Sequence, residues 1–355
     1  MGVFGTVAVT LLVFGFLIFI HEFGHYITAR IFKVTINEFS IGMGPRLFSR
    51  VSKKTAIRYS VAAIPIGGFV AMAGEDGEVN DPLVSDDPNS FDKKPAWQRF
   101  IITFAGAFIN IVAGIIAMMI LTSMIKIGNT TVVQFADAEE TGYEVSSEAS
   151  GLKEGDVITR VDGKRVRILD ELSYEIMRRG NEPIDITVIR DGEELVVPDV
   201  VFPTLTDQGQ TFGAMDFKVR AVEKTFSSVM RYSWCKSTLI IRMCWESLYD
   251  LITGRYTFAA VSGPVGMSSA IGEAASDGPA TLIYIVALIS INLGVMNLLP
   301  IPALDGGRLI TIIIEMITRK RLPPKIEGMI NGVGLALLLA FSFFVMIKDI
   351  FQLVF

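Results

Sequence analysis

Four long apolar segments limit the folds open to this chain of 355 residues. A helix needs roughly 20 consecutive apolar residues to cross the hydrocarbon core of a bilayer, which is about 30 Å thick. Runs of this kind without a charged residue occur at residues 3–20, 100–125, 278–304 and 328–347. The sequence therefore predicts an α-helical polytopic membrane protein with four transmembrane helices.

The first apolar run differs from a cleaved signal peptide. A signal peptide begins with basic residues and ends at a cleavage site of small residues. Here no Lys or Arg precedes the run, and it continues directly into His21 and Glu22. We expect this segment to remain in the protein as its first membrane helix.

Charge and cysteine content argue against two other classes of protein. The net charge is −5 and Lys and Arg are scattered along the chain, so the basic footprint of a nucleic-acid-binding protein is missing. The two cysteines, Cys235 and Cys244, lack the CxxC spacing of a metal site. We expect both cysteines to be packing residues, and we expect no nucleic-acid partner.

The distribution of Lys and Arg predicts the orientation of the chain, because short loops rich in these residues stay on the cytoplasmic side. Ten of them lie between the first two apolar runs, and five lie between the last two. We expect both loops to face the cytoplasm. Residues 126–277 and both ends of the chain are then extracytoplasmic.

The extracytoplasmic region begins with a predicted β-rich domain, residues 126–205. Apolar residues alternate on both sides of an Asp-Gly turn at residues 191–192, as in a β-hairpin. Residues 151–163 place glycines at turns around a short apolar strand, and this stretch resembles a PDZ domain, with another small β domain as the alternative. PDZ domains bind an extended peptide by adding it to a sheet edge. The resemblance implies peptide-binding residues at Gly151, Leu152, Gly155 and Asp156.

Residues 206–277 are predicted to form a linker that contains a helix at residues 225–251. Apolar and aromatic residues are mixed there with Lys236, Arg242 and Glu246, so this helix is too charged to span a membrane. The pattern fits an amphipathic helix in the membrane interface. It fits a packed helix of the soluble domain equally well.

Two short apolar segments, residues 42–45 and 64–70, are rich in turn-forming residues. Non-helical backbone is tolerated at membrane depth only where it is buried in protein or lines a cavity. We therefore predict re-entrant β segments beside an active site, with an ordinary cytoplasmic loop as the alternative.

The only two histidines of the chain lie four residues apart, in the motif His21-Glu22-Phe23-Gly24-His25. On a helix this HExxH spacing places both imidazoles on one face, where they can share a zinc ion. Glu22 then lies near the metal and can act as general base on a water that zinc activates. Ionisable groups inside a membrane span are costly and are kept for function, which favours a metal site over histidines at the membrane interface.

A catalytic zinc ion takes three protein ligands and leaves one position open. The chain has no further histidine, so the third ligand is expected to be a carboxylate. Glu38 is the candidate nearest in sequence, and Asp305 is the candidate at the end of the third apolar run. The predicted orientation places Asp305 at the same membrane face as His21 and His25, which favours it over Glu38.

Several motifs occur in one order along the chain: HExxH, residues 42–45, residues 65–69, the PDZ-like insert, Ser262 to Gly266 and Asn297 to Gly307. Together they resemble the bacterial site-2 proteases of the regulator of sigma-E protease type, over nearly the whole chain. The resemblance implies Zn²⁺ held by His21, His25 and Asp305, with Glu22 catalytic. The residues that help position the substrate in this family correspond to Asn297, Pro300 and Pro302. The strand that includes Gly67 and Gly68 is expected to hold an unwound substrate by edge pairing.

Two departures from the family pattern concern substrate gating. The chain has one PDZ-like domain where some relatives have two, and Arg308 follows the Gly-Gly pair where some relatives carry His. The catalytic residues are unaffected by either departure.

The predicted organisation has four parts. Residues 1–125 hold the first two membrane helices, the HExxH motif and the re-entrant loop; residues 126–205 form the PDZ domain. Residues 206–277 form the linker with the amphipathic helix, and residues 278–355 hold the last two membrane helices. We expect a multi-pass protein of the bacterial inner membrane, in contact with lipid, with its active site near the cytoplasmic side.

The expected activity is zinc-dependent cleavage of transmembrane segments in single-span membrane proteins. The resemblance implies anti-sigma factors or remnant signal peptides as substrates, after a first extracytoplasmic cut by an upstream site-1 type protease. A zinc transporter or sensor is one alternative, and it predicts that Glu22 is dispensable. A catalytically silent membrane scaffold that presents a PDZ domain is the other.

Overall fold

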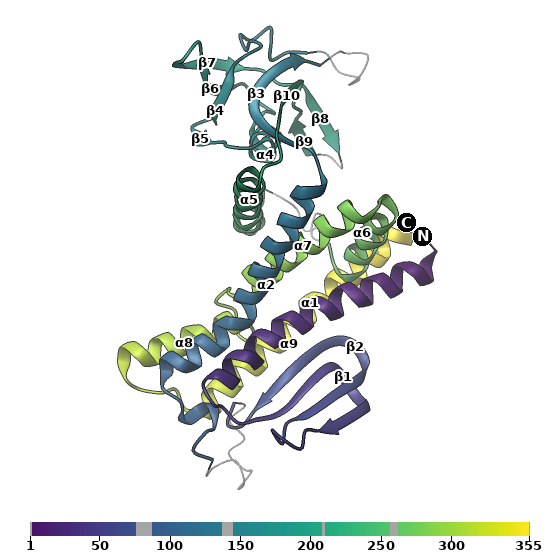
Figure 1. Cartoon of the computed structure of the whole chain (residues 1–355), viewed down its shortest axis with the longest axis vertical. Helices are drawn as coiled ribbons and strands as arrows, with labels where there is room; N and C mark the ends of the chain where they lie inside the picture. The colour runs from purple at the N-terminus through teal and green to yellow at the C-terminus, as the bar shows by residue number, and fades with distance from the viewer. Residues whose placement is uncertain (1, 76–86, 137–144, 208–209, 256–261, 355) are drawn as a thin grey trace. The chain divides into compact units, whose positions relative to one another are not determined.

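The structure is a computed structural model, and it describes residues 2–75, 87–136, 145–207, 210–255 and 262–354. The chain forms two compact units (Figure 1). The helical unit comprises residues 1–117 and 240–355, and the β unit comprises residues 118–239.

Among the described residues, four helices are long and apolar enough to cross a membrane: α1 (Val3–Ile31), α2 (Ala96–Met124), α7 (Pro279–Asn297) and α9 (Pro324–Val354). By length and composition they agree with the four predicted membrane helices. The first helix runs beyond the predicted apolar run, so the whole HExxH motif lies within α1.

The third membrane helix ends earlier than predicted, at Asn297 instead of Leu304. Pro300 and Pro302 follow directly, and proline has no backbone N–H to continue a helix. A separate helix, α8 (Asp305–Thr318), begins just after them. Another helix that the sequence analysis did not predict, α6 (Pro264–Asp277), precedes α7.

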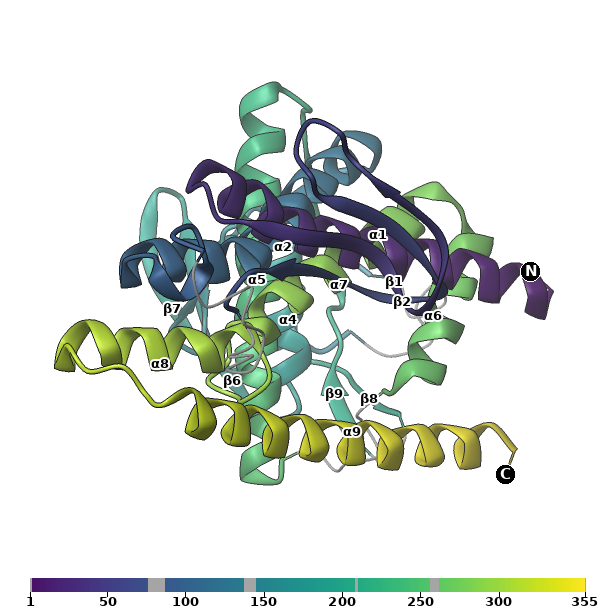
Figure 2. The ribbon, with the colours of Figure 1, turned by 90° about the horizontal axis from the view of Figure 1, so that it is seen from below.

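Two long strands, β1 (Ile36–Val51) and β2 (Arg58–Met72), form an antiparallel sheet directly after α1. The first half of β1 is paired on both sides, since Ser40 lies opposite Phe69 on one side and opposite Ser60 on the other. Residues 68–72 therefore form one outer edge of this sheet. Both short apolar segments of the sequence lie in these strands, and the sheet lies across α1 (Figure 2).

A buried apolar core fastens this sheet to the C-terminal part of α1. Its members come from α1, both strands, the residues that precede each strand, the 3₁₀ helix η1 (Phe91–Lys93) and the start of α2. They are Ala29, Val34, Ile36, Phe39, Ile57, Val70, Met72, Phe91 and Ile102. Because interiors are close-packed, this core holds β2 at a defined position beside the HExxH turn.

The Ser262-to-Gly266 motif joins α6 to α9. The backbone N–H groups of Gly263 and Gly266 both donate to Oδ2 of the buried Asp349 on α9, at 2.9 Å each. A carboxylate at a helix N-terminus satisfies donors that have no partner within the helix. This motif therefore connects two helices of the unit.

The β unit is built on one main sheet with the strand order β10-β3-β4-β6-β7, and the short β5 pairs with β4. The strands are β3 (Ile127–Phe135), β4 (Val157–Val161), β5 (Lys164–Arg165), β6 (Ile184–Arg190), β7 (Glu193–Val200) and β10 (Phe217–Val222). A second hairpin contains β8 (Thr204–Asp207) and β9 (Gln210–Gly213). The sheet thus continues beyond residue 205, where the sequence analysis placed the end of the domain, because β10 pairs with β3.

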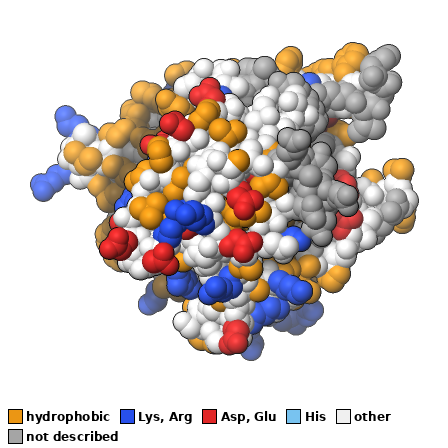
Figure 3. Space-filling view, turned by 90° about the horizontal axis from the view of Figure 1, so that it is seen from above, with side chains coloured by type: hydrophobic (Ala, Val, Ile, Leu, Met, Phe, Trp, Pro, Cys, Tyr) orange, Lys and Arg blue, Asp and Glu red, His pale blue; other side chains and the backbone are white. Residues whose placement is uncertain are grey.

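The helix α4 (Leu169–Arg179) packs on this sheet through Leu172 and Ile176, which are fully buried. Alternate residues of β6, Ile184, Ile186 and Val188, point into the same core, as the period of two in a strand requires. The face shown in Figure 3 carries acidic and basic side chains close together, and its described part has no large patch of one sign.

The predicted helix at residues 225–251 is α5 (Phe226–Thr253). In the β unit its buried residues include Tyr232 and Cys235, while Phe226 and Trp234 are 81% and 58% exposed. One face therefore packs, and the other presents aromatic side chains. The buried face agrees with a packed helix of the domain, and a location in the membrane interface stays a prediction.

Candidate metal centre

The two histidines of the HExxH motif meet on one face of α1, as the helical spacing predicts. Their Nε2 atoms are 3.2 Å apart, and their rings lie edge to face with centroids 4.8 Å apart. The His25 side chain is buried, and its Nδ1 donates to the carbonyl of Ile102 on α2 at 2.9 Å. That hydrogen bond leaves Nε2 of His25 unprotonated and able to bind a metal.

Asp305 reaches the histidines although it is 280 residues from His25 in the sequence. Its Oδ2 atom lies 3.2 Å from Nε2 of His21 and 3.4 Å from Nε2 of His25. The residue stands in the first turn of α8, and the two glycines after it make this position possible. A Cβ atom at Gly306 would overlap the carbonyl of Leu299, and one at Gly307 would lie 2.5 Å from the carbonyl of Ile301.

The three atoms fit a zinc site. Ligand atoms about 2.0–2.1 Å from a tetrahedral zinc ion lie roughly 3.3–3.4 Å from one another. The separations here are 3.2, 3.2 and 3.4 Å. Oδ2 of Asp305 is buried and makes no well-aligned hydrogen bond with the described residues, so it is available as a ligand. Two imidazoles and one carboxylate are also a donor set that catalytic zinc uses.

Glu22 lies on α1 next to His21, and β2 passes close to it. A Cβ atom at Gly68 would lie 3.3 Å from Cγ of Glu22 and 3.0 Å from the carbonyl of Ser40. Gly67 has a φ of +100°, which glycine adopts far more readily than other residues. The two glycines therefore allow the outer strand to approach the predicted catalytic carboxylate closely.

Helix α2 forms a wall of the site, which the sequence analysis missed. A Cβ atom at Gly106 would overlap the imidazole of His25, and one at Gly24 would lie 2.5 Å from the carbonyl of Ala105. The two helices cross closely because both carry small residues at the crossing. The glycines at positions 24 and 106 were the available signal in the sequence.

Glu38, the other candidate for the third ligand, is engaged elsewhere. Its carboxylate accepts two hydrogen bonds from Arg46, at 2.9 and 2.7 Å, and one from Ser60 at 2.6 Å. The hydrogen bonds from Arg46 are the main reason why the pKa of Glu38 is lowered. Glu38 therefore holds the β1–β2 sheet together, and the cluster of possible metal ligands contains Asp305 in its place.

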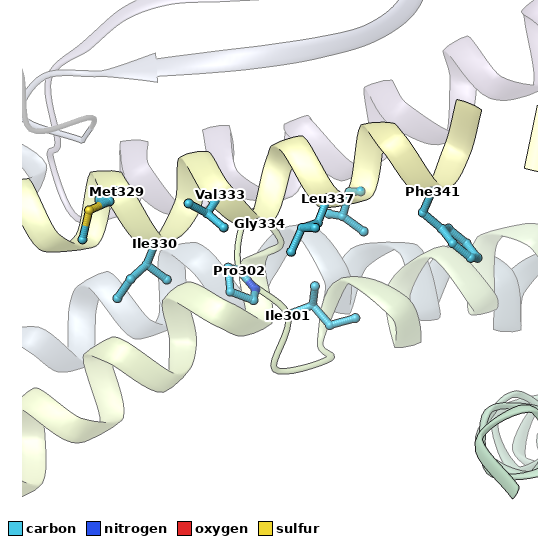
Figure 4. A pocket seen from close by; sticks show the side chains of 9 residues that line it. Ile301, Pro302, Met329, Ile330, Val333, Gly334, Leu337 and Phe341 are labelled. Carbon is cyan, nitrogen blue, oxygen red and sulfur yellow. The ribbon is translucent and has the colours of Figure 1, made fainter. Parts of the chain in front are cut away.

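The residues expected to position substrate surround the start of α8. Asn297 is the last residue of α7, Pro300 is exposed, and Pro302 packs against Gly334 of α9. Pro302 and Ile301 also line an apolar cavity of about 520 Å³ along α9 (Figure 4). The cavity thus lies next to the loop that leads into α8 and Asp305.

The four residues predicted to bind peptide lie in the turn segment directly before β4. Leu152 is buried in the core of the β unit, and Asp156 is fully buried. Asp156 accepts hydrogen bonds from Arg190 at 2.7 and 2.8 Å, while Gly151 and Gly155 have φ values of +106° and +93° at turns. The side chains of Leu152 and Asp156 are therefore not available to a peptide, because they stabilise the domain.

Arg308, the departure noted in the sequence, links α8 to the end of β2. Its guanidinium pairs with the carboxylate of Glu75 and lies 5.0 Å from the ring centroid of Phe91. The contact joins the helix of Asp305 to the strand that passes Glu22.

Comparisons with known proteins agree with this geometry. Residues 9–341 match the family model described as peptidase family M50. A protein of Fusobacterium nucleatum with a provisional zinc-metalloprotease name is 33% identical over 98% of this chain and 99% of its own. The zinc metalloprotease RasP of Geobacillus kaustophilus is 29% identical, over 96% of each chain. The regulator of sigma-W protease RasP of Bacillus subtilis is 27% identical, over 98% of this chain and 99% of its own.

The family match covers nearly the whole chain, including the HExxH helix, the β unit and the start of α8. The Geobacillus kaustophilus relative is named a zinc metalloprotease, and the Bacillus subtilis relative is named a protease. The chain therefore belongs to peptidase family M50, the site-2 proteases, and is a zinc metalloprotease.

Proposed function

We propose that this metalloprotease cleaves transmembrane segments of single-span membrane proteins. One observation carries the proposal: the cluster of His21, His25 and Asp305 includes two residues of α1, a helix long and apolar enough to cross a membrane. A peptide bond that reaches this cluster would be cut within or next to the bilayer. Cleavage of a soluble substrate would not require metal ligands on a helix of this length and hydropathy.

The roles of the site residues follow from their positions. His21, His25 and Asp305 would hold zinc, which when bound supplies Lewis acidity at the scissile carbonyl and makes water more acidic. Glu22 accepts the proton of the attacking water and delivers it to the leaving amine. The carboxylate of Glu22 lies one residue from His21 in the same helical turn, which suits this transfer.

Substrate binding is proposed to use the outer edge of the β1–β2 sheet. A helical substrate protects its peptide bonds by internal hydrogen bonds, so it has to unwind locally before cleavage. Residues 68–72 form an outer edge of the sheet, and Gly68 brings that edge close to Glu22. Strand addition at this edge would hold the unwound segment extended. Asn297, Pro300 and Pro302, at and after the end of α7, are proposed to contact the same segment.

The β unit is proposed to be an extracytoplasmic PDZ domain that limits access to substrates already shortened by a first cut. Its sheet carries α4 on one face, and β10 is the end strand of the described sheet, where a peptide could be added. An upstream site-1 type protease would make the first cut. The Bacillus subtilis relative is named as a regulator of sigma-W, which supports anti-sigma factors as the substrate class; remnant signal peptides are a second class.

The protein is proposed to lie in the bacterial inner membrane with its active site near the cytoplasmic side. The loops rich in Lys and Arg, at residues 30–99 and 308–325, support this orientation. The exposed aromatic face of α5 supports contact with the lipid interface.

Cleavage of a reconstituted single-span substrate tests the proposal. Wild type and Glu22→Gln are compared, with zinc quantified in both proteins and Glu193→Gln, on the exposed start of β7, as the matched control. We expect Glu22→Gln to retain zinc and lose cleavage, while the control keeps both. Unchanged cleavage by Glu22→Gln would contradict the assignment of Glu22 as the general base.

Deletion of residues 127–222, replaced by a flexible linker, tests the role of the β unit. We expect the shortened protein to cleave trimmed substrates and also to accept untrimmed ones. If it cleaves no trimmed substrate although it is stably folded, the gating role is wrong.

A further inference from the structure

The most informative group outside the catalytic residues is the side chain of Asn110. It lies on α2 one turn after Gly106, the residue on which His25 packs, and it is completely buried. Its Nδ2 atom is 3.2 Å from Nδ1 of His21. Its Oδ1 atom is buried and has no hydrogen-bond partner among the described residues. A buried amide oxygen without a partner is costly.

The orientation of this amide decides which nitrogen of His21 carries the proton. When Nδ2 faces His21, Nδ1 accepts the hydrogen bond and the single proton of the neutral imidazole lies on Nε2. That nitrogen faces Asp305 and could not then bind a metal. When Oδ1 faces His21, Nδ1 donates to it and Nε2 has a free lone pair.

A half turn of the amide exchanges Oδ1 and Nδ2 within the same space, because the two ends of the group have nearly the same size and shape. This turn gives Oδ1 the donor that it lacks. It also gives His21 the tautomer that a metal ligand requires. One rotation therefore pairs Oδ1 with Nδ1 of His21, while Nδ2 takes the position that Oδ1 held.

We propose that Asn110 is a positioning residue of the metal centre, whose side-chain carbonyl accepts the Nδ1 proton of His21 and directs Nε2 to zinc. The inference rests on the proposed role of His21 as a ligand. His25 has the equivalent partner in the carbonyl of Ile102. Helix α2 then supplies the outer hydrogen-bond acceptor of both histidines, although it supplies no ligand.

Helix α7 packs closely on the backbone of α2 beside Asn110. Oγ of Ser290 donates to the backbone carbonyl of Asn110 at 2.7 Å. One turn later, Gly294 allows a close approach, since a Cβ atom there would lie 2.7 Å from the carbonyl of Ala107. These contacts involve the backbone of α2, whereas the amide of Asn110 faces His21.

The alternative explanation is that Asn110 only stabilises the packing of helices by hydrogen bonding, as polar residues often do inside membrane proteins. The two roles differ in their chemistry. A helix-joining residue would tolerate any change that preserves packing and stability. A positioning residue requires an acceptor oxygen opposite Nδ1, and a carboxylate should serve even better, because carboxylate–histidine pairs raise the basicity of a zinc-bound imidazole.

The experiment measures zinc affinity of the purified full-length protein by competition with a chelator. The variants are Asn110→Leu, which keeps the volume but removes the acceptor, and Asn110→Asp, which keeps an acceptor. Ser290→Ala is the matched control, because it removes a buried hydrogen bond to the same residue without touching the amide. The absorption spectrum of the Co²⁺-loaded protein reports the ligand geometry separately from activity.

We expect Asn110→Leu to bind zinc about 10–100-fold more weakly than wild type and to change the Co²⁺ spectrum. Asn110→Asp should bind zinc at least as tightly as wild type, and Ser290→Ala should stay within twofold. If Asn110→Leu binds as wild type does, or if Asn110→Asp loses as much affinity as Asn110→Leu, the inference is wrong. Should Asn110→Leu fail to fold, Asn110→Asp decides alone, since a loss of affinity in that variant overturns the proposal.

Failure of the proposed function would look different. In that case the wild type would bind no zinc or would not cleave the single-span substrate. If only the role of Asn110 is wrong, the wild type binds zinc and cleaves the substrate, and Asn110→Leu binds zinc as tightly as the wild type does.

Discussion

Gly106 lies directly against the imidazole of His25, so close that a Cβ atom at residue 106 would overlap the ring. The contact shows that α2 shapes the metal centre, because the absence of a side chain at residue 106 leaves room for the imidazole of His25. Position 106 has to be glycine because the imidazole occupies the volume that a side chain would need. This close contact makes α2 part of the site although α2 carries none of the proposed ligands.

The variant Gly106→Ala should therefore displace His25. We expect its zinc affinity to fall by at least about tenfold and cleavage to fall with it, as measured by chelator competition and by substrate cleavage. Gly328→Ala is the control, because nothing lies within 4 Å of a Cβ atom at that position. Equal zinc affinity in Gly106→Ala and wild type would show that the ring can move without loss.

Asp305→Asn should weaken zinc binding and abolish cleavage while the protein remains folded in the membrane. The amide keeps the size of the carboxylate but loses the charge that faces both Nε2 atoms. Metal content and cleavage are measured on the same preparation, with Asp191→Asn, in an exposed turn of the β unit, as control. Full activity of Asp305→Asn would exclude the residue as a ligand.

Glu38→Gln should lower stability and leave zinc binding unchanged. The substitution removes a buried charge that accepts hydrogen bonds from Arg46 and Ser60, and we expect a cost of about 1–3 kcal/mol. Thermal unfolding and metal content, measured side by side, separate the two effects. A loss of zinc with unchanged unfolding temperature would reinstate Glu38 as a metal ligand.

Gly68→Ala should slow cleavage without loss of zinc. Its Cβ atom would come 3.0 Å from the carbonyl of Ser40 and 3.3 Å from Cγ of Glu22, so the strand or the carboxylate has to shift. Small displacements of catalytic groups are expensive, and we expect kcat to fall by about tenfold or more. Gly332→Ala is the control, since a Cβ atom there meets open space. An unchanged kcat would mean that β2 is not near the reacting bond.

Asp156→Ala should destabilise the β unit by on the order of 3 kcal/mol. The fully buried carboxylate is the partner of Arg190 and also accepts the backbone N–H of Lys153 at 2.9 Å. Limited proteolysis of the β unit during a thermal ramp measures the effect, and zinc content should not change. If the β unit of this variant resists proteolysis as wild type does, Asp156 has no structural role and could bind a peptide.

The local sequence determined the parts of the protein that depend on neighbours along the chain. The four membrane helices follow from the length of the apolar runs, since a helix satisfies its own backbone hydrogen bonds in lipid. The pairing of His21 with His25 follows from the pitch of α1. The two short apolar segments were correctly expected to be strands, because turn residues interrupt them.

Other features depended on contacts between distant segments. Pro300 and Pro302 signal the end of the third helix, but hydropathy does not change there, so the length of the apolar run, which reaches Leu304, overstates the length of the helix. The strand β10 joined the sheet of the β unit by pairing with β3, about 90 residues earlier, so the boundary at residue 205 came too soon.

At the site, the sequence alone determined the chemistry of the donors, two imidazoles and the carboxylates that could join them. Only the tertiary structure shows that Arg46 and Ser60 surround Glu38 and that both histidines lie beside Asp305, which supports Asp305 as the proposed third ligand. It also brought Asn110 and Gly106 to the histidines. The physical reason is that ligand selection and outer hydrogen bonds depend on distances between helices, and these distances are set by packing that no local pattern records.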